Sequence, residues 1–244
     1  MVRLGVVVDQ IAVIRAERRG KEPDPISSAI QVEMGGADGI VATLRDDRKF
    51  VTDRDVNLLK EIINTHFNVR LAVNDDMIRT AVSIAPDMVT LIPSIEQEAL
   101  TSEGVDVVDN YDYLVEIIGT LHASNIVVCA RIEPDVKQVK AIARAGADYV
   151  ELNTFLLSHA QDLNEQTEEL EKLRSIAMAA NKLGLGVSAG GGLNYQNIKE
   201  IAKIPQIEEV NIGYAIICRA LMVGIERAVQ DMIALLREMK SISM

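Results

Sequence analysis

Short apolar runs alternate with stretches of helical periodicity along the chain, and this alternation most restricts the fold that the sequence can adopt. The runs are rich in valine and isoleucine and occupy residues 4–9, 39–44, 69–74, 88–93, 126–132, 149–154, 186–190 and 208–214. Near-continuous apolar runs of this length are typical of parallel strands that are covered on both faces. The sequence therefore predicts a parallel sheet in which strands and helices alternate.

The segments between the runs carry apolar residues at helical spacing. The expected helices occupy residues 25–37, 53–66, 75–85, 107–123, 135–145, 165–183, 196–203 and 219–240. Pro25 suits a first helical position, and Asn74 and Asn194 suit N-caps. Eight strand–helix units in 244 residues, without a linker rich in Pro, Gly or Ser, predict an α/β protein with a single (β/α)₈ TIM-barrel domain over residues 1–244.

A doubly wound open sheet is the alternative fold. The first strand ends in Val8, Asp9 and Gln10 and is not followed by a G-x-G-x-x-G motif, which argues against this alternative. Gly-Ala-Asp occurs twice between an expected helix and an expected strand, at 36–38 and 146–148, and this repetition favours a barrel of repeated units.

The seventh apolar run ends at Gly190 and is followed directly by Gly191 and Gly192. Glycine in a strand weakens it and often marks a point where a ligand or another backbone comes close. In a TIM barrel the loops after strands seven and eight form the usual phosphate site, and Gly213 lies at the end of the eighth run. We therefore predict that these four glycines bind a phosphate through free backbone N–H groups, with a plain tight turn as the alternative.

The composition argues against several classes of partner. The formal net charge of −11 and the aromatic content of 3% argue against nucleic acid, which needs a basic face and base-stacking side chains. No apolar run reaches the roughly 18 residues of a membrane span. The start of the chain lacks the layout of a signal peptide, so we expect a cytoplasmic protein. No His/Cys spacing suits zinc, and we expect neither a metal nor a cofactor.

Five segments form a set that extends over nearly the whole chain: VVDQIAVIRAERRGKEPDP, GADGIVATLRDDRKFVTDRDV, LTSEGVD, SAGGGLNYQNI and NIGYAIICRAL. These segments and their spacing resemble the pyridoxine 5′-phosphate synthase (PdxJ-like) family. The resemblance implies a (β/α)₈ barrel, a homo-oligomer that is typically an octamer, and small phosphorylated substrates. The family condenses 1-deoxyxylulose 5-phosphate with an aminoacetone phosphate to close the pyridine ring of vitamin B6.

The sequence departs from the family pattern at its proton carriers. Six positions where the family has histidine carry other residues: Gln10, Thr43, Phe50, Asn153, Gly191 and Tyr214. Arg70 stands where the family has glutamate. Histidine suits proton transfer because its pKa lies near neutral pH, and each lost general acid or base typically lowers a rate by about 10²–10⁴. We therefore expect a divergent member of the family.

The resemblance and the strand ends together indicate the site residues. We expect Glu151, Arg70 and Asp9 to be the catalytic residues, with Glu151 as acid or base and Arg70 stabilising charge. The expected ligand-binding residues, besides the four glycines, are Arg18, Arg45, Arg48, Asn211 and Tyr214. Two roles stay open: Glu151 is alternatively a structural partner of an arginine, and Arg70 either binds a second anionic group or pairs with Glu151 or Asp9.

We expect a diverged enzyme that binds a small phosphorylated or anionic metabolite at the C-terminal rim and performs a lyase, isomerase or condensation step. One alternative is a genuine pyridoxine 5′-phosphate synthase that works with an altered set of residues. The other is a catalytically silent binding or scaffold protein. Of the three histidines, only His159 follows a strand end, and we interpret it as a surface residue.

Overall fold

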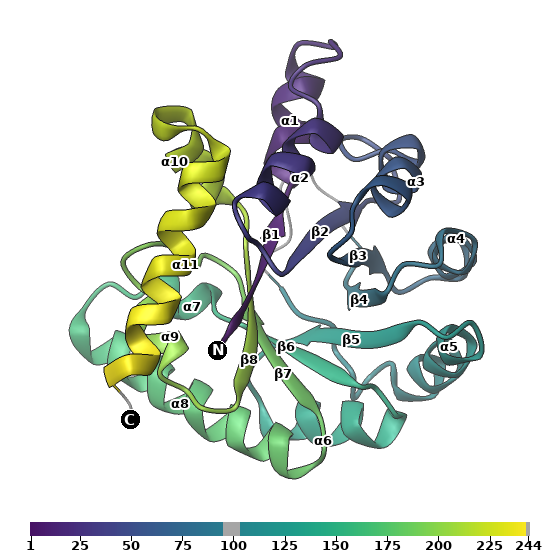
Figure 1. Cartoon of the computed structure of the whole chain (residues 1–244). Helices are drawn as coiled ribbons and strands as arrows, with labels where there is room; N and C mark the ends of the chain where they lie inside the picture. The colour runs from purple at the N-terminus through teal and green to yellow at the C-terminus, as the bar shows by residue number, and fades with distance from the viewer. Residues whose placement is uncertain (95–102, 243–244) are drawn as a thin grey trace.

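The computed structural model describes residues 1–94 and 103–242, so Leu100, Thr101 and Ser102 of the LTSEGVD segment lie outside the described residues. In the described part of the chain, eight parallel strands form a closed barrel in sequence order (Figure 1). They are β1 (Arg3–Val7), β2 (Gly39–Leu44), β3 (His66–Ala72), β4 (Met88–Ile92), β5 (Val127–Ile132), β6 (Tyr149–Asn153), β7 (Gly186–Gly190) and β8 (Ile207–Ile212). The predicted TIM barrel is confirmed.

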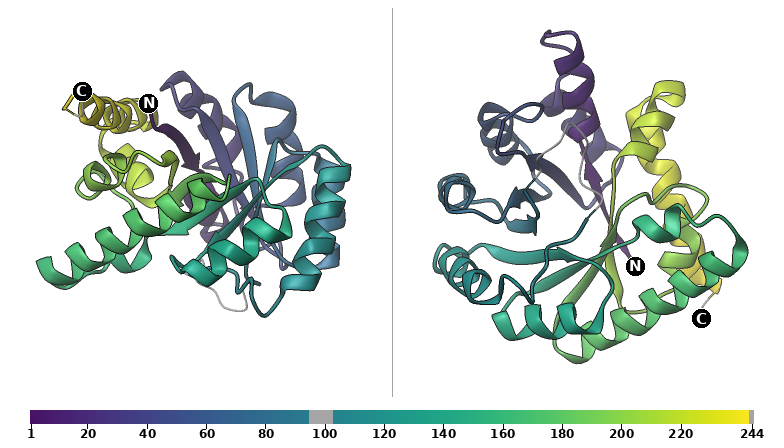
Figure 2. Two further views of the ribbon diagram at one scale, coloured as in Figure 1. Left: turned by 90° about the horizontal axis from the view of Figure 1, so that it is seen from below. Right: turned by 180° about the vertical axis from the view of Figure 1, so that it is seen from behind.

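The barrel is covered by helices on its outside, as all three ribbon views show (Figures 1 and 2). The helices are α1 (Asp9–Glu17), α2 (Pro25–Met34), α3 (Asp53–Ile62), α4 (Asp75–Ile84), α5 (Tyr111–Ala123), α6 (Val136–Ala145), α7 (Phe155–Ser158), α8 (Leu163–Lys182), α9 (Ile198–Ala202), α10 (Tyr214–Val223) and α11 (Ile225–Ile242). None of the described helices is both long and apolar enough to cross a membrane.

The two faces of the strands differ in chemistry. Residues such as Leu4, Val6 and Ile40 are fully buried and belong to the apolar core between strands and helices. Most polar residues of the strands are buried as well, and several bond to one another across the barrel, as Arg70 and Asn211 do with Glu151. The polar site is therefore built from the strands themselves, inside the barrel.

The two Gly-Ala-Asp turns close the N-terminal rim. Gly36 and Gly146 have φ angles of +93° and +94°, which favour glycine. The aspartate of each turn then accepts a 2.8 Å hydrogen bond from a strand backbone: Asp38 from Leu4, and Asp148 from Val128. Each turn thus joins the start of one strand to the start of the strand before it.

Some predicted boundaries are wrong. The expected final helix at 219–240 is two helices, because Gly224 adopts a φ of +83° between α10 and α11. Tyr214, which the continuous apolar run assigned to the eighth strand, begins α10. The helices α1 and α7 were not predicted, since both follow a strand directly without a turn signal. The N-terminal features of α2 and α4 are confirmed, with Pro25 at N1 and Asn74 accepting a 3.0 Å bond from the Met77 N–H.

Asp55 ties α3 to α1, and its replacement by asparagine should lower the free energy of unfolding by about 2–3 kcal/mol. Its carboxylate accepts bonds of 2.8 and 2.6 Å from Arg15 and completes a capping box with Thr52. Burial alone would raise the pKa of Asp55, but the bonds from Arg15 and Thr52 hold this pKa below its ordinary value. Its contribution is therefore present above about pH 4 and is lost as the pH falls through the lower folded pKa.

Urea unfolding of the two proteins between pH 3 and pH 7 measures this difference. Asp53→Asn is the matched control, because Asp53 lies in the first turn of the same helix with an exposed side chain. It should change stability by less than about 1 kcal/mol. Equal effects of the two substitutions would contradict the assignment.

Candidate active site

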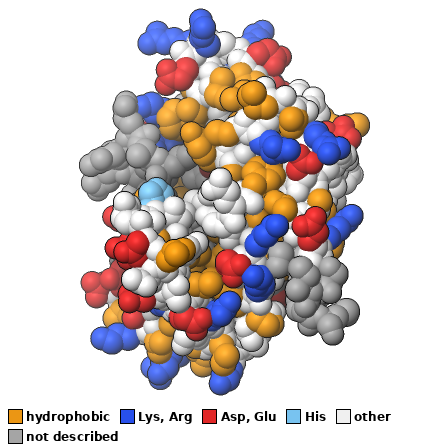
Figure 3. Space-filling view, turned by 90° about the vertical axis from the view of Figure 1, so that its left-hand side faces the viewer, with side chains coloured by type: hydrophobic (Ala, Val, Ile, Leu, Met, Phe, Trp, Pro, Cys, Tyr) orange, Lys and Arg blue, Asp and Glu red, His pale blue; other side chains and the backbone are white. Residues whose placement is uncertain are grey.

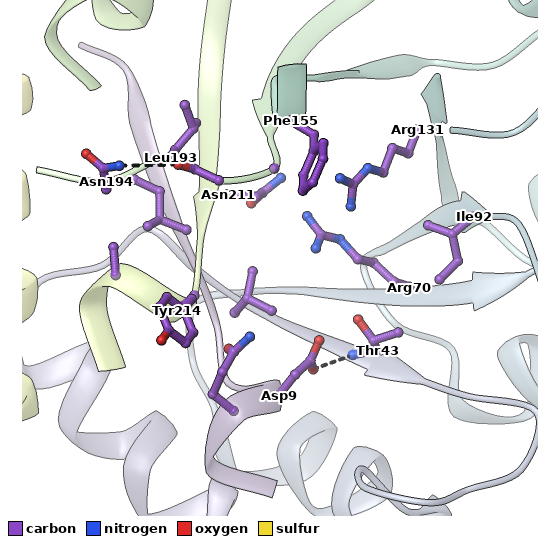
Figure 4. A pocket seen from close by; sticks show the side chains of 17 residues that line it. Asp9, Thr43, Arg70, Ile92, Arg131, Phe155, Leu193, Asn194, Asn211 and Tyr214 are labelled. Carbon is purple, nitrogen blue, oxygen red and sulfur yellow. Dashed lines mark hydrogen bonds between the residues drawn. The ribbon is translucent and has the colours of Figure 1, made fainter. Parts of the chain in front are cut away.

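A cavity of about 270 Å³ opens at the C-terminal ends of the strands. Its walls come from the ends of β1, β2, β3, β4, β5 and β8, from Phe155 of α7, from the turn after β7 and from the start of α10. This is the rim where TIM barrels carry their active sites. Figure 4 shows Arg70 and Arg131 pointing into the same space beside Phe155, with Asp9 and Thr43 to one side.

The turn after β7 forms one wall of this cavity. Gly191 and Gly192 adopt φ angles of +111° and +72°, a region that favours glycine. Thr154 holds the turn in place, since its Oγ1 donates a 2.6 Å bond to the carbonyl of Gly191. Asn194 then accepts bonds from the N–H groups of Gln196 and Asn197. It thus caps the turn ahead of α9, whereas the N-cap of α9 itself is Asn197, so the predicted N-cap at Asn194 is wrong.

The N-terminus of α10 forms the adjoining wall. Gly213 is its N-cap, and Gly213, Tyr214 and Ala215 line the cavity. The first N–H groups of a helix have no acceptor within the helix, and the helix dipole adds positive potential at the same place. The start of α10 therefore offers backbone donors to the cavity beside the glycine turn, an arrangement that suits an oxyanion.

Glu151 lies fully buried beneath this cavity and does not line it. Its carboxylate accepts bonds of 2.7 and 3.0 Å from Arg70 Nη2 and one of 2.7 Å from Asn211 Nδ2. Burial alone would raise the pKa of Glu151, but the charges of Arg70 and Arg131 hold this pKa below its ordinary value. The sequence left open whether Arg70 pairs with Glu151, pairs with Asp9 or binds a second anionic group. In the structure, Arg70 forms an ion pair with Glu151.

Gly190 belongs to the same buried layer. A side chain at Gly190 would meet the Glu151 carboxylate at 3.1 Å, and Gly190 does not line the cavity. Its small size accommodates Glu151.

Arg131 is a wall residue that the sequence analysis did not assign to the site. Its side chain is 7% exposed, its Nη2 donates a 3.0 Å bond to Asn153, and its Nε lies 3.8 Å from a Glu151 oxygen. Burial, together with the charge of Arg70, lowers the pKa of Arg131 in spite of Glu151. Its position near the end of the fifth apolar run, at 126–132, was the available signal.

Asp9 is the carboxylate that lines the cavity together with Arg70. Its Oδ1 accepts a 2.7 Å bond from the Thr43 N–H. Burial raises the pKa of Asp9, and the bonds from Thr43 and the charge of Arg70 offset this only in part. A carboxyl group with a raised pKa is better matched to proton transfer near neutral pH than an ordinary aspartate.

Three of the predicted anion-binding arginines lie outside the cavity lining. Arg18 is exposed just after α1. Arg45 is buried, but it bonds to Asp47 at 2.9 and 2.8 Å and lowers the pKa of that carboxyl to about 2. Arg48 bonds to Asp53 at 3.2 Å. Tyr214 does line the cavity, at its edge, with 72% of its surface exposed.

His159 lies beside the cavity rather than in its lining. It is exposed, stacks on Phe155 with 3.9 Å between ring centroids, and its Nδ1 lies 2.9 Å from the Phe155 carbonyl. Among the described residues, no group of three His, Cys, Asp or Glu side chains is arranged to hold a metal ion.

The sequence matches known proteins over almost its full length. Residues 4–238 match the profile of the family described as pyridoxal phosphate biosynthesis protein PdxJ. A pyridoxine 5′-phosphate synthase from Geotalea daltonii is 44% identical over 237 residues, which cover 97% of this chain and 99% of the relative. One from Geobacter sulfurreducens is likewise 44% identical over 237 residues, with the same coverage of both chains.

Two solved structures of low sequence identity resemble the chain in fold alone. The thiamine phosphate pyrophosphorylase of Pyrococcus furiosus superposes with a TM-score of 0.62 at 19% identity, over 98% of this chain and 96% of the other. The phosphoribosylanthranilate isomerase of Thermotoga maritima superposes with a TM-score of 0.61 at 10% identity, over 98% and 100% of the two chains.

Proposed function

This chain belongs to the pyridoxal phosphate biosynthesis protein PdxJ family, and from that membership we propose that it acts as a pyridoxine 5′-phosphate synthase with an altered set of active-site residues. The observation that carries the proposal is the cavity itself. It combines an anion-binding wall of backbone N–H groups with a buried carboxyl group, Asp9, whose pKa is raised by burial. The start of α10 binds a phosphorylated substrate, and Asp9, in the neighbouring segment of the cavity lining, moves protons.

The phosphate of the substrate binds at Gly191, Gly192, Gly213 and the first N–H groups of α10, with Asn211 and Tyr214 close to the ester. Backbone donors at a helix N-terminus are a general phosphate-binding arrangement. Gly190 contributes indirectly, by leaving room for Glu151. Arg18, Arg45 and Arg48 lie outside the lining and have no direct part in this proposal.

Asp9 is the general acid and base of the proposed reaction. It takes over proton transfer at a rim where the family places histidines, which are Gln10 and Thr43 here. Arg70 stabilises negative charge that develops on the substrate, and Glu151 positions Arg70 through their buried ion pair. A carboxylate with a lowered pKa is a weak base, which favours this positioning role for Glu151 over proton transfer.

A diverged enzyme is the second candidate, and a specific observation favours it. Within the described residues the cavity lining contains two arginines and no histidine. Such a site suits a single lyase, isomerase or condensation step on a small anionic metabolite better than the several proton transfers of ring closure. A silent binding protein would keep the phosphate wall without turnover.

Growth of a bacterial strain that lacks its own pyridoxine 5′-phosphate synthase tests the first candidate. We expect the chain to restore growth without added vitamin B6. The Geobacter sulfurreducens relative, expressed in the same strain, is the positive control. Asp9→Asn should abolish the rescue, since the loss of an acid–base group costs about 10²–10⁴ in rate. Asp112→Asn, an exposed position on α5, is the matched control. If the chain is expressed in soluble form and growth is still not restored, the synthase assignment is overturned and the diverged enzyme remains.

The predicted assembly and location belong to the same proposal. We expect a homo-oligomer in the cytoplasm. Figure 3 shows hydrophobic side chains among charged ones on one face of the molecule. Leu221 and Met222 at the end of α10 are 74% and 83% exposed, which supports a contact between subunits at this helix. Size-exclusion chromatography with light scattering measures the number of subunits.

A further inference from the structure

We propose that Phe155, supported by His159, makes this cavity selective for phosphate esters that carry a flat, conjugated ring. The inference rests on the proposed function, in which the start of α10 and the adjoining glycine turn form the phosphate wall. It adds that the ring of the ligand stacks on Phe155. In a ring-closing reaction the substrates are open chains and the product is flat, so Phe155 contacts the closed ring.

Phe155 is an aromatic residue that the core does not use. The chain has three phenylalanines and no tryptophan. Phe67 is fully buried in the core, and Phe50 packs against the core from outside. Among the described residues that form the core or pack against it, Phe155 is not included; it is half-buried and lines the cavity. Core packing therefore does not explain an aromatic ring at this position.

One face of the Phe155 ring is covered by His159. The two rings are stacked, with 3.9 Å between their centroids and 26° between their planes. His159 does not line the cavity, so the cavity reaches the Phe155 ring from the side away from His159. The cation–π contacts among the described residues involve the rings of Phe50 and Tyr195, and no guanidinium group occupies this second face.

The backbone of Phe155 is held at both ends. Its N–H donates a 3.1 Å bond to Asn153 Oδ1, and its carbonyl accepts a 2.7 Å bond from Ser158 Oγ. A ring that is already fixed loses little conformational entropy when a ligand stacks on it. The available face of Phe155 is therefore preorganised for a flat partner.

The ring also lies next to the phosphate wall. A side chain at Gly191 would lie 3.3 Å from the Phe155 backbone nitrogen, so Phe155 adjoins the glycine turn. Figure 4 shows the Phe155 side chain pointing into the cavity beside Arg131. A ligand whose phosphate binds at the start of α10 thus has its ring within reach of Phe155. Stacking of two aromatic rings raises affinity by roughly two- to tenfold, which an open-chain phosphate does not gain.

Titration calorimetry with two matched probes tests this selectivity. Benzyl phosphate and cyclohexylmethyl phosphate carry the same phosphate and a six-membered ring, but only the benzyl ring is flat and conjugated. The cyclohexyl ring is at least as apolar, so burial alone gives it no disadvantage. We expect benzyl phosphate to bind roughly three- to tenfold more tightly. Glycerol 3-phosphate measures the phosphate wall alone, and pyridoxine 5′-phosphate should exceed it by at least the same factor.

Phe155→Leu should remove the preference, because leucine is apolar but has no π face. The affinities for the two ring probes should then agree within about twofold, and the affinity for glycerol 3-phosphate should change by less than about threefold. Phe155→Tyr should keep the preference. Leu156→Ala, at the exposed next position of α7, is the matched control and should change nothing.

His159 is a positioning residue, since it acts through the Phe155 ring. His159→Ala should lower the preference for benzyl phosphate without abolishing phosphate binding. His159→Phe keeps a stacked ring and should restore the preference. A merely structural role of His159 would change the affinities for both ring probes equally.

Equal affinities of the unmodified chain for the two ring probes would overturn this inference and leave the proposed function standing. A preference that survives Phe155→Leu would also overturn it. Failure of the folded protein to bind any of the probes would overturn both the phosphate wall and the stacking site. A preference that depends on Phe155, in a chain that fails to restore growth, would support the stacking site and overturn only the synthase assignment.

Discussion

Replacing Arg70 by methionine should lower the free energy of unfolding by about 3–5 kcal/mol, because it leaves Glu151 as a buried carboxylate without its close ionic partner. Glu151 is fully buried and accepts both of its shortest arginine bonds from Arg70. The 3.8 Å approach of Arg131 is too long to replace them. Urea unfolding at pH 7, followed by circular dichroism, measures the loss.

The same substitution should have a smaller effect in acid. In the native protein the pKa of Glu151 is held below its ordinary value, burial being outweighed by the charges of Arg70 and Arg131. Its stabilising contribution is therefore present above about pH 4 and is lost as the pH falls through the folded pKa. Without Arg70 this pKa rises, so the difference between the two proteins should narrow as the pH decreases.

Two further variants separate the ion pair from general effects. Arg79→Met removes an exposed arginine of α4 that lies 3.6 Å from Asp76, and it should cost less than about 1 kcal/mol. Arg70→Met combined with Glu151→Leu should recover much of the loss, since the unpaired charge is gone. An Arg70→Met effect no larger than that of Arg79→Met would show that Glu151 does not depend on Arg70.

Replacing Gly192 by alanine should weaken phosphate binding at least tenfold and lower the free energy of unfolding by about 2–4 kcal/mol. The new Cβ would lie 1.9 Å from Ser158 Oγ and 2.5 Å from Ser158 Cβ. Ser158 is held by a 2.7 Å bond to the Phe155 carbonyl, so the glycine turn has to move instead. That movement displaces the backbone donors that bind the phosphate.

Gly184→Ala is the matched control for this substitution. Gly184 has a φ of +86°, similar to that of Gly192, but an added Cβ there meets nothing within 4 Å. It should therefore show only the cost of the left-handed backbone, about 1 kcal/mol, with unchanged phosphate binding. Calorimetry with inorganic phosphate and urea unfolding measure both quantities. Unchanged phosphate affinity in Gly192→Ala would contradict the proposed phosphate wall.

At Gly191, one of the positions where the family resemblance expects histidine, the structure leaves no room for a side chain. A side chain at this position would lie 2.6 Å from Asn153 Oδ1 and 2.9 Å from Arg131 Nη2, on a backbone with a φ of +111°. Asn153 and Gly191 are both positions where the family resemblance expects histidine. Asn153 and Gly191 both contact the space around Arg131 Nη2. A histidine restored at Gly191 alone would therefore collide with Asn153 and Arg131.

The sequence by itself determined the barrel, the rim at which the cavity opens, and the glycines Gly191, Gly192 and Gly213 that line it. Strand and helix periods, the glycines after β7 and β8, and the caps at Pro25 and Asn74 are local patterns, and local sequence is sufficient to specify them. The family resemblance added the likeness to the synthases that the comparisons bear out.

Only the tertiary structure decided which charged residues share the cavity. Arg70 and Glu151 are 81 residues apart and meet because the closed barrel places β3 opposite β6. Arg45 and Arg131 both stand at strand ends, yet Arg45 turns to Asp47 while Arg131 lines the cavity. The direction of a side chain at a strand end depends on the closure of the sheet and on the loop beyond it, which the spacing of residues along the chain does not contain.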